Sequence, residues 1–233
     1  MNVIFTLKQY PRKHNAFKRL TLLLCIIVLF AFTTACKQTI NYFDYVSELR
    51  SNIVIAKTES LSLRIYATVK ESPYTTDGIP RETFPRMEAH LITPEGNKTV
   101  EISMAIGENT YGGEMSYDFV KGEYYYAHSI DVSSQKSIVC HIQYGEEKLT
   151  LTASSVITEN TIHPNDALKK LQTEKSELFS SMTDKYGFAG EIYLRLLFED
   201  SPYYYIGVID RQGKCTAFLM NAETGKILAE RIS

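Results

Sequence analysis

The feature that most constrains the fold is a period-two alternation of apolar residues in the first half of the chain. In the segment NIVIAKTESLSLRIYATVKE, apolar side chains recur at every second position, at Leu61, Leu63, Ile65, Ala67 and Val69. Successive side chains of a strand point to opposite faces, so this spacing predicts strands with one buried face. The composition, with 16 Tyr and 11 Phe but no Trp, adds to the preference for strands.

Polar turns separate further strand-like segments between residues 51 and 157. Residues 94–97 divide AHLITPEGNKTVEISM into two strands, and residues 145–147 make a hairpin of SIVCHIQYGEEKLTLTASSVI. The segments GGEMSYDFV and EYYYAHSIDV lie between them, while residues 71–86 contain three prolines and are expected to form an exposed loop. The sequence therefore predicts a mainly β fold, with an immunoglobulin-like β-sandwich over residues 51–157. The Cys…Trp…Cys pattern of antibody domains is missing from the sequence.

The pattern becomes helical after a linker at residues 158–164. In PNDALKKLQTEKSELFSSM, the residues Leu168, Leu171, Leu178 and Met182 form a one-sided apolar stripe, which predicts an amphipathic helix. Four strand-like segments then follow: EIYLRLLFED, YYYIGVID, CTAFLMN and KILAERI. One helix on an antiparallel meander would bury both apolar faces, so residues 165–233 are predicted to form a small α+β module.

The closing segment MNAETGKILAERI contains a turn of the form Asn-x-x-Thr-Gly before the last strand. It is loosely similar to the end of PepSY-type modules, in which such a turn precedes the final strand. The similarity is confined to the C-terminal module, and it implies the same order of a helix followed by strands.

The N-terminal segment has a composition of its own. Residues 1–35 carry five basic residues and no acidic residue, and the last basic one, Arg19, is followed by the apolar run LTLLLCIIVLFAF. This run is shorter than the roughly 20 residues that a membrane-spanning helix needs. Small residues then lead through Ala35 to Cys36. A basic start, an apolar run and a small-residue exit are typical of an export signal.

The order of these parts resembles the bacterial lipoprotein signal, in which a small residue precedes a cysteine. The resemblance implies that the Cys36 thiol receives a diacylglyceryl group and that signal peptidase II cleaves between Ala35 and Cys36. Thr33 stands where the family prefers leucine. Two acyl chains would hold the protein firmly on the membrane, and residues 36–50 would form its tether. An uncleaved anchor and a cytosolic core segment remain the alternatives for the apolar run.

The remaining charge is mildly acidic. Five of the 25 basic residues belong to residues 1–35, which leaves 20 basic against 27 acidic residues from Cys36 onward. The net charge of −7 gives no sign of a basic surface that would bind nucleic acid, so no nucleic-acid partner is expected.

No motif for catalysis, metal binding or cofactor binding is found in the sequence, which has no HExxH, no P-loop and no GxSxG. We therefore expect no catalytic residue, no cofactor and no metal. Cys140 and Cys215 fall in different predicted modules, so we expect two separate thiols. Two functional alternatives stay open. One is a cell-envelope hydrolase, or a regulator of one, in which His128 or His141 meets a carboxylate or a serine; the other is a small-ligand-binding lipoprotein.

Two tyrosine triplets, at residues 124–126 and 203–205, are candidates for a binding patch. In a strand the outer two side chains of each triplet share a face, so Tyr124, Tyr126, Tyr203 and Tyr205 form the candidate patch. The alternative is that these tyrosines pack across strands and cover the core. Together, these features predict a lipid-anchored bacterial protein on the outer face of the cytoplasmic membrane. Its expected role is non-catalytic binding or scaffolding, with the membrane and an envelope protein of unknown identity as partners.

Overall fold

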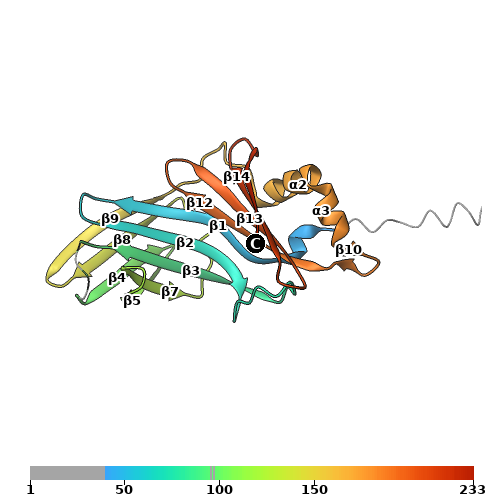
Figure 1. Cartoon of the computed structure of the whole chain (residues 1–233). Helices are drawn as coiled ribbons and strands as arrows, with labels where there is room; N and C mark the ends of the chain where they lie inside the picture. Colours follow the sequence, from blue (N-terminus) through green and yellow to red (C-terminus); the bar gives the residue numbers. More distant parts are fainter. Residues whose placement is uncertain (1–39, 95, 97) are drawn as a thin grey trace, which may run out of the picture. The chain divides into compact units, whose positions relative to one another are not determined.

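One long strand, β1 (Val46–Lys57), connects all parts of the main sheet (Figure 1). On one side it pairs with β2 (Ser62–Glu71) along almost its whole length. On the other side its first half pairs in parallel with β12 (Gly190–Phe198), and its second half pairs with β9 (Glu147–Ser155). The sheet therefore forks at β1. The structure is a computed structural model that describes residues 40–94, 96 and 98–233.

The long arm of the sheet has the strand order β15-β14-β13-β12-β1-β2-β3-β7-β6, and a second arm runs from β9 through β8 and β4 to β5. Apart from β1 with β12, all these described pairs are antiparallel. The remaining bounds are β3 (Thr83–Ile92), β4 (Val100–Ile106), β5 (Asn109–Glu114), β6 (Ser116–Asp118), β7 (Glu123–His128), β8 (Ser137–Tyr144), β13 (Pro202–Asp210), β14 (Cys215–Asn221), β15 (Ile227–Ile232), and the short pair β10 (Thr183–Asp184) and β11 (Gly187–Phe188).

The prediction of a mainly β fold is confirmed, whereas an immunoglobulin-like sandwich is not. An immunoglobulin-like sandwich consists of two separate sheets. Here β9 is hydrogen-bonded directly to β1, so both layers belong to one sheet that folds back on itself and nearly forms a barrel. The reason is the length of β1, which extends far enough to pair with β9 beyond the point where β12 leaves it.

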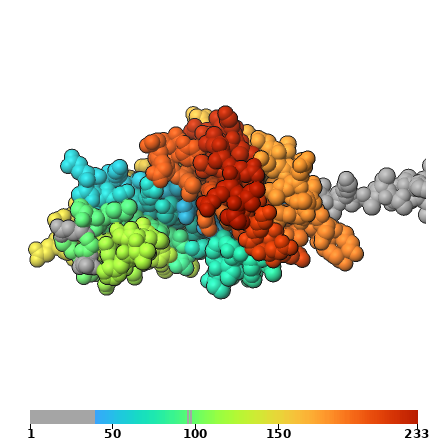
Figure 2. All heavy atoms as spheres, viewed as in Figure 1, coloured from blue at the N-terminus to red at the C-terminus, as the bar shows by residue number. Residues whose placement is uncertain are grey.

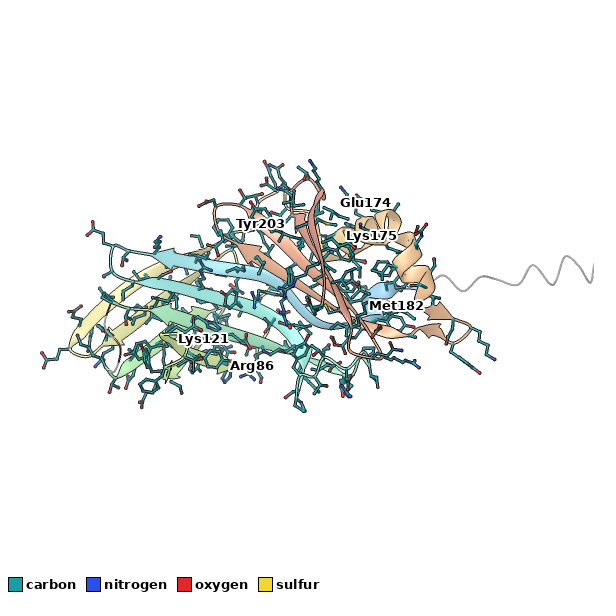
Figure 3. The ribbon with its side chains drawn as sticks, viewed as in Figure 1. Arg86, Lys121, Glu174, Lys175, Met182 and Tyr203 are labelled. Atoms are coloured by element: carbon teal, nitrogen blue, oxygen red, sulfur yellow. The ribbon has the colours of Figure 1, made fainter. Side chains whose placement is uncertain are left out.

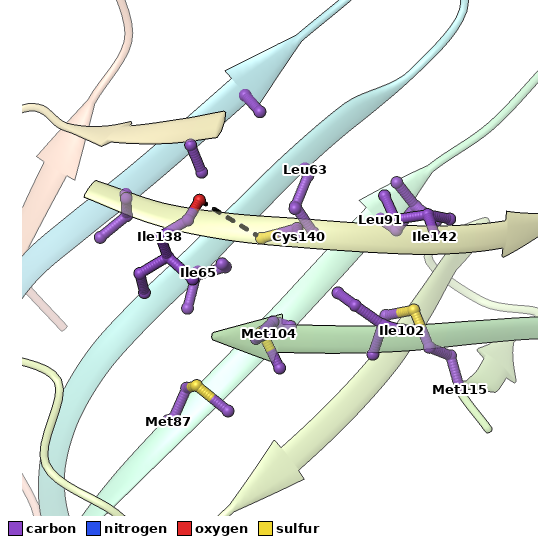
Figure 4. Close-up of a cluster of buried hydrophobic side chains, with 14 of the residues drawn as sticks. Leu63, Ile65, Met87, Leu91, Ile102, Met104, Met115, Ile138, Cys140 and Ile142 are labelled. Atoms are coloured by element: carbon purple, nitrogen blue, oxygen red, sulfur yellow. Dashed lines mark hydrogen bonds between the residues drawn. The ribbon is translucent and has the colours of Figure 1, made fainter. Parts of the chain in front are cut away.

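The first hydrophobic core lies between the two arms (Figure 4). β8 alternates exposed and buried residues without interruption, as its period-two pattern predicts. The largest buried side chains meet across the layers, with β2 and β3 on one side and β4 and β8 on the other. They include Leu63, Ile65, Met87, Leu91, Ile102, Met104, Ile138, Cys140 and Ile142.

The second core lies between β12–β14 and two helices, α2 (Pro164–Glu174) and α3 (Ser176–Ser181). The predicted helix is interrupted at Lys175, whose backbone leaves the helical conformation at φ −118° and ψ 36°. Lys175 instead pairs with Glu230 of β15 at 2.7 Å. The helix break turns Phe179 into the core, where it is 1% exposed.

The described residues Ile40–Ser233 form one compact unit. Residues 46–50, which the sequence assigns to the tether, form the first part of β1 and follow the short 3-10 helix η1 (Tyr42–Tyr45). The predicted signal peptide, Ala35, Cys36 and the start of the tether lie outside the described residues. Among the described residues, no helix has the length and apolar character needed to cross a membrane.

Candidate functional site

The candidate site lies on one face of the long arm, which we call the open face and which adjoins the second core at Tyr66. Residues paired on neighbouring strands point to the same face, so the strand register identifies its members. Most of them are half-buried by one another, and Figure 3 labels one from β13 and one from β3. The open face consists of Tyr203, Tyr205, Tyr193, Arg195, Glu48, Arg50, Tyr66, Lys70, Arg86, Glu88, His90 and Tyr125.

At the β12–β13 end, two tyrosines and an arginine stack on one another. The ring centroids of Tyr193 and Tyr205 are 5.5 Å apart, and the guanidinium carbon of Arg195 lies 4.5 Å from the Tyr193 centroid. Gly207 makes room for the Tyr193 ring, because a Cβ atom there would lie 2.0 Å from it. Burial raises the pKa of the Tyr193 hydroxyl, which lies 3.4 Å from the Sγ atom of Cys215. These contacts hold the rings in place as an aromatic surface.

At the β2–β3–β7 end, three rings form an edge-to-face chain. The centroid of His90 lies 5.1 Å from that of Tyr66 and 5.1 Å from that of Tyr125. Nδ1 of His90 lies 2.8 Å from Oε1 of Glu123, and Arg86 donates a hydrogen bond of 3.0 Å to the Tyr125 hydroxyl. Polar partners therefore fix the orientation of these rings.

A buried carboxylate, Glu88, ties the same strands together. Its Oε1 atom lies 2.6 Å from Nζ of Lys70 and 3.2 Å from Nε of Arg86. Burial acts to raise the pKa of Glu88, but the hydrogen bond and charge of Lys70, together with Arg86, hold the pKa below its ordinary value. Glu88 is therefore ionised at neutral pH and its charge is compensated.

The centre of the open face contains a second buried carboxylate. Glu48 of β1 is 5% exposed and accepts a hydrogen bond from Nη2 of Arg195 on β12. Burial acts to lower the pKa of Arg195, but the bond to Glu48 and its charge raise the pKa above its usual value. Beside this pair, the guanidinium carbon of Arg50 lies 4.1 Å from the centroid of Tyr66.

The loop at residues 72–82, which we call the covering loop, closes one end of the open face against the β13–β14 turn. A Cβ atom on Gly78 would lie 2.2 Å from the carbonyl oxygen of Asp210, so the two backbones are in direct contact. In Figure 2 the teal segment that contains this loop lies next to the red C-terminal segment. Gly78 has a φ of +75°, which only glycine adopts readily. Arg81 holds the loop together through ion pairs with Asp77 and Glu71.

Beneath the covering loop, Glu191 of β12 is buried without a partner for its carboxylate. The residue has no solvent exposure, and neither carboxylate oxygen has a partner of hydrogen-bond geometry among the described residues. Burial, together with the nearby charges of Glu71 and Asp77, raises the pKa of Glu191 to about 7. The backbone N–H groups of Gly78 and Ile79 lie close enough to oppose this rise only in part. Glu191 therefore titrates near neutral pH.

Two hollows lie away from the open face. A groove of about 450 Å³ lies beside β1, β2 and the start of α2. Leu49 and Val69 line it from the sheet, and Phe43, Ile162 and Tyr204 surround it. A shallower hollow of about 630 Å³ lies over the outer side of β4, β8 and β9.

The larger hollow contains His141, one of the histidines named for a hydrolase. His141 is paired across the strands with Ser103 and Thr150, and its Nδ1 atom lies 3.0 Å from Oγ1 of Thr150. The other candidate, His128, packs on the ring of Tyr111 at 5.1 Å. Among the interactions found for the described residues, neither histidine forms a hydrogen bond with a carboxylate or with Ser103.

The structure separates the four tyrosines of the candidate patch. Tyr203 and Tyr205 are half-buried on the open face, and Tyr204 between them faces the second core, as the strand period predicts. Tyr124 is 1% exposed and its hydroxyl bonds to the backbone of Lys98, so it lies in the core and leaves no surface for a partner. Tyr126 is on the same side as Tyr124 and donates a hydrogen bond to the carbonyl of Gly112.

The sequence pattern missed four residues at the centre of the open face: Arg50, Tyr66, Tyr193 and Arg195. A signal for them existed, because Glu48 and Arg50, like Tyr193 and Arg195, are two positions apart and therefore share a strand face. Their convergence depends on the parallel pairing of β1 with β12, which the sequence pattern does not specify.

The two described cysteines are separate and free, as expected. Burial raises the pKa of Cys140 to about 12, so it stays protonated in the first core. Within the described part of the chain, no group of three or more His, Cys, Asp or Glu residues could hold a metal ion.

Comparison with known proteins gives no relative: no family model, no curated protein and no solved structure matches this chain. Function is therefore inferred from the residues themselves.

Proposed function

We propose that this chain is a lipid-anchored extracytoplasmic bacterial protein that binds a protein of the cell envelope through the open face, without catalysis. The observation that carries this proposal is the composition of the open face, on which the half-buried Tyr66, Tyr125 and Tyr205 and the buried Tyr193 lie beside arginines. Tyrosine and arginine are enriched at the centres of protein interfaces, where rigid rings bury area at low entropic cost.

The signal at the N-terminus supports the location. Between Cys36 and η1 the chain has only residues 37–41. Because an extended chain spans at most about 3.6 Å per residue, a lipid on Cys36 would hold the folded unit within about 20 Å of the membrane surface. A partner on the open face would then be an envelope protein close to that surface.

Replacing Cys36 with alanine is expected to release the protein from the membrane, because the acyl chains are lost with the thiol. Membrane fractionation, with intact-mass spectrometry of the mature protein, measures both the location and the lipid. Cys215→Ala is the matched control and should keep the lipid. If Cys36→Ala stays in the membrane with residues 1–35 attached, the chain has an uncleaved anchor instead.

Replacing Tyr203 and Tyr205 together with serine is expected to reduce capture of the partner by about tenfold or more, since truncating an interface tyrosine often costs over 1 kcal/mol. Cross-linking in living cells, followed by mass spectrometry, measures the capture. Tyr186→Ser is the control, because Tyr186 is 84% exposed and lies outside the open face. Unchanged capture by a folded double variant would sink the proposal.

A second candidate function, binding of a small ligand, is favoured by the groove of about 450 Å³. Its volume and its largely apolar lining are typical of ligand sites. A partner captured by the open face, with no small molecule copurifying, would count against it.

A further inference from the structure

Arg50 lies at the centre of the open face with no anionic partner. Among the interactions found for the described residues, its guanidinium forms no ion pair and no hydrogen bond, and its Nε atom is buried without an acceptor. Its guanidinium carbon lies over the ring of Tyr66, 4.1 Å from the centroid. Burial lowers the pKa of Arg50 from its usual value, which reflects the cost of keeping this charge out of water.

A second arginine stands beside Arg50. Arg195 is its register partner on β12, so the two side chains start from neighbouring positions on the same face. The charge of Arg195 contributes to the lowered pKa of Arg50, and the Nε atom of Arg195 is also buried without an acceptor. Like charges on directly paired strand residues destabilise a sheet.

The nearby carboxylates are already engaged. Glu48 accepts its hydrogen bond from Arg195, and Glu88 is held by Lys70 and Arg86. The charges of Glu48 and Glu88 raise the pKa of Arg50, but neither carboxylate forms an ion pair with Arg50 among the described contacts. Two guanidinium groups therefore share one carboxylate, which leaves one positive charge unmatched at the centre of the open face.

We propose that Arg50 and Arg195 form an anion-binding site that takes an aspartate or glutamate side chain of the protein bound on the open face. A single carboxylate matches the charge that Arg50 and Arg195 leave unmatched beside Glu48. The planar guanidinium fork suits two parallel hydrogen bonds to a carboxylate. The proposal rests on the proposed function, because it describes the partner of that same face.

The test measures binding of a fluorescent hexaglutamate peptide to the full chain in detergent micelles, by fluorescence anisotropy in low salt. Arg50→Gln is expected to weaken binding at least tenfold, and Arg50→Lys less, because lysine keeps the charge but lacks the fork. Arg64→Gln is the matched control, since Arg64 carries the same charge on the neighbouring strand β2 but is paired with Glu199 at 3.6 Å. We expect it to weaken binding less than threefold.

Three outcomes would overturn the inference. The first is no binding of hexaglutamate, and the second is equal weakening by Arg50→Gln and Arg64→Gln, which would show a general charge effect. The third is Arg50-dependent binding of phosphatidylglycerol vesicles without binding of the peptide, which would assign the site to a lipid headgroup. If cross-linking still captures a partner through Tyr203 and Tyr205 in any of these cases, the proposed function stands and only the anion site fails.

Thermal unfolding gives an independent readout of Arg50→Met. An arginine that holds the fold together would lower the melting temperature when removed. An arginine kept for a ligand leaves the unbound protein as stable or raises its melting temperature, because a like-charge contact is removed. A drop in melting temperature of the size caused by Arg195→Met would contradict the inference.

Discussion

Replacing Glu48 with alanine is expected to lower the free energy of unfolding by about 3 kcal/mol at pH 7. The variant leaves Arg195 and Arg50 side by side without the carboxylate that compensates them. Removing one partner of a buried ion pair costs about 3–5 kcal/mol, because the other charge stays buried and unpaired. We take the lower end of this range, since the Arg195 side chain is 29% exposed. Urea unfolding at pH 7 measures the change.

Two further variants separate the ion pair from the loss of packing. In Glu48→Ala/Arg195→Met the unpaired charge is gone, so the double variant should recover part of the lost stability. Glu199→Ala is the matched control, because the Glu199 side chain is 78% exposed and surface ion pairs contribute at most about 1 kcal/mol. A double variant less stable than Glu48→Ala would show that Arg195 stabilises the sheet through packing and not through its charge.

Replacing Glu191 with glutamine is expected to raise the free energy of unfolding by about 2 kcal/mol at pH 8 and to leave it unchanged at pH 4. The pKa of Glu191 is about 7 in the folded protein, because burial disfavours its charged form, and about 4.3 in the unfolded chain. The folded state therefore holds the proton more tightly. The stability that this gives is complete below about pH 4.3 and is lost as the pH rises through 7.

Urea unfolding of the wild type and Glu191→Gln at pH 4, 6 and 8 measures this dependence. The difference between the two proteins should grow between pH 4 and pH 8, because glutamine does not ionise. Glu223→Gln, at an exposed turn between β14 and β15, is the control and should follow the wild type. A difference that does not vary with pH would mean that Glu191 keeps its ordinary pKa.

Local patterns were enough to predict most strands, the helical segment and the opposite faces of Tyr203 and Tyr204. Each of these depends on side chains a few positions apart, where the period of a strand or a helix decides which face is buried. The patterns missed residues 46–50, which begin β1, and residues 83–86, which were expected in a loop but begin β3. The break at Lys175 was not predicted, because it depends on a contact with Glu230 on a distant strand. The fork at β1 was missed for the same reason, since β12 and β9 pair with successive parts of one edge of that strand and both lie far from it in the sequence.

The open face was only partly visible in the sequence. Tyr203 and Tyr205 were identified because they stand two apart in one strand. Arg50 could not be recognised as unpaired, since the pairing of Glu48 with Arg195 joins residues that are 147 positions apart. Such a site depends on strand order, which a period-two pattern does not contain.

The fork at β1 also sets the order in which the chain can fold. Ser47 of β1 donates a hydrogen bond to the carbonyl of Ile192, which lies 145 residues further along the chain. During synthesis β1 and β2 emerge early, while the outer edge of β1 has no strand to pair with until β9 and then β12 are made. Contacts between such distant segments form slowly, and an open strand edge invites pairing with other molecules. Before its last strands arrive, a newly made chain therefore exposes an edge at which it can aggregate with its neighbours.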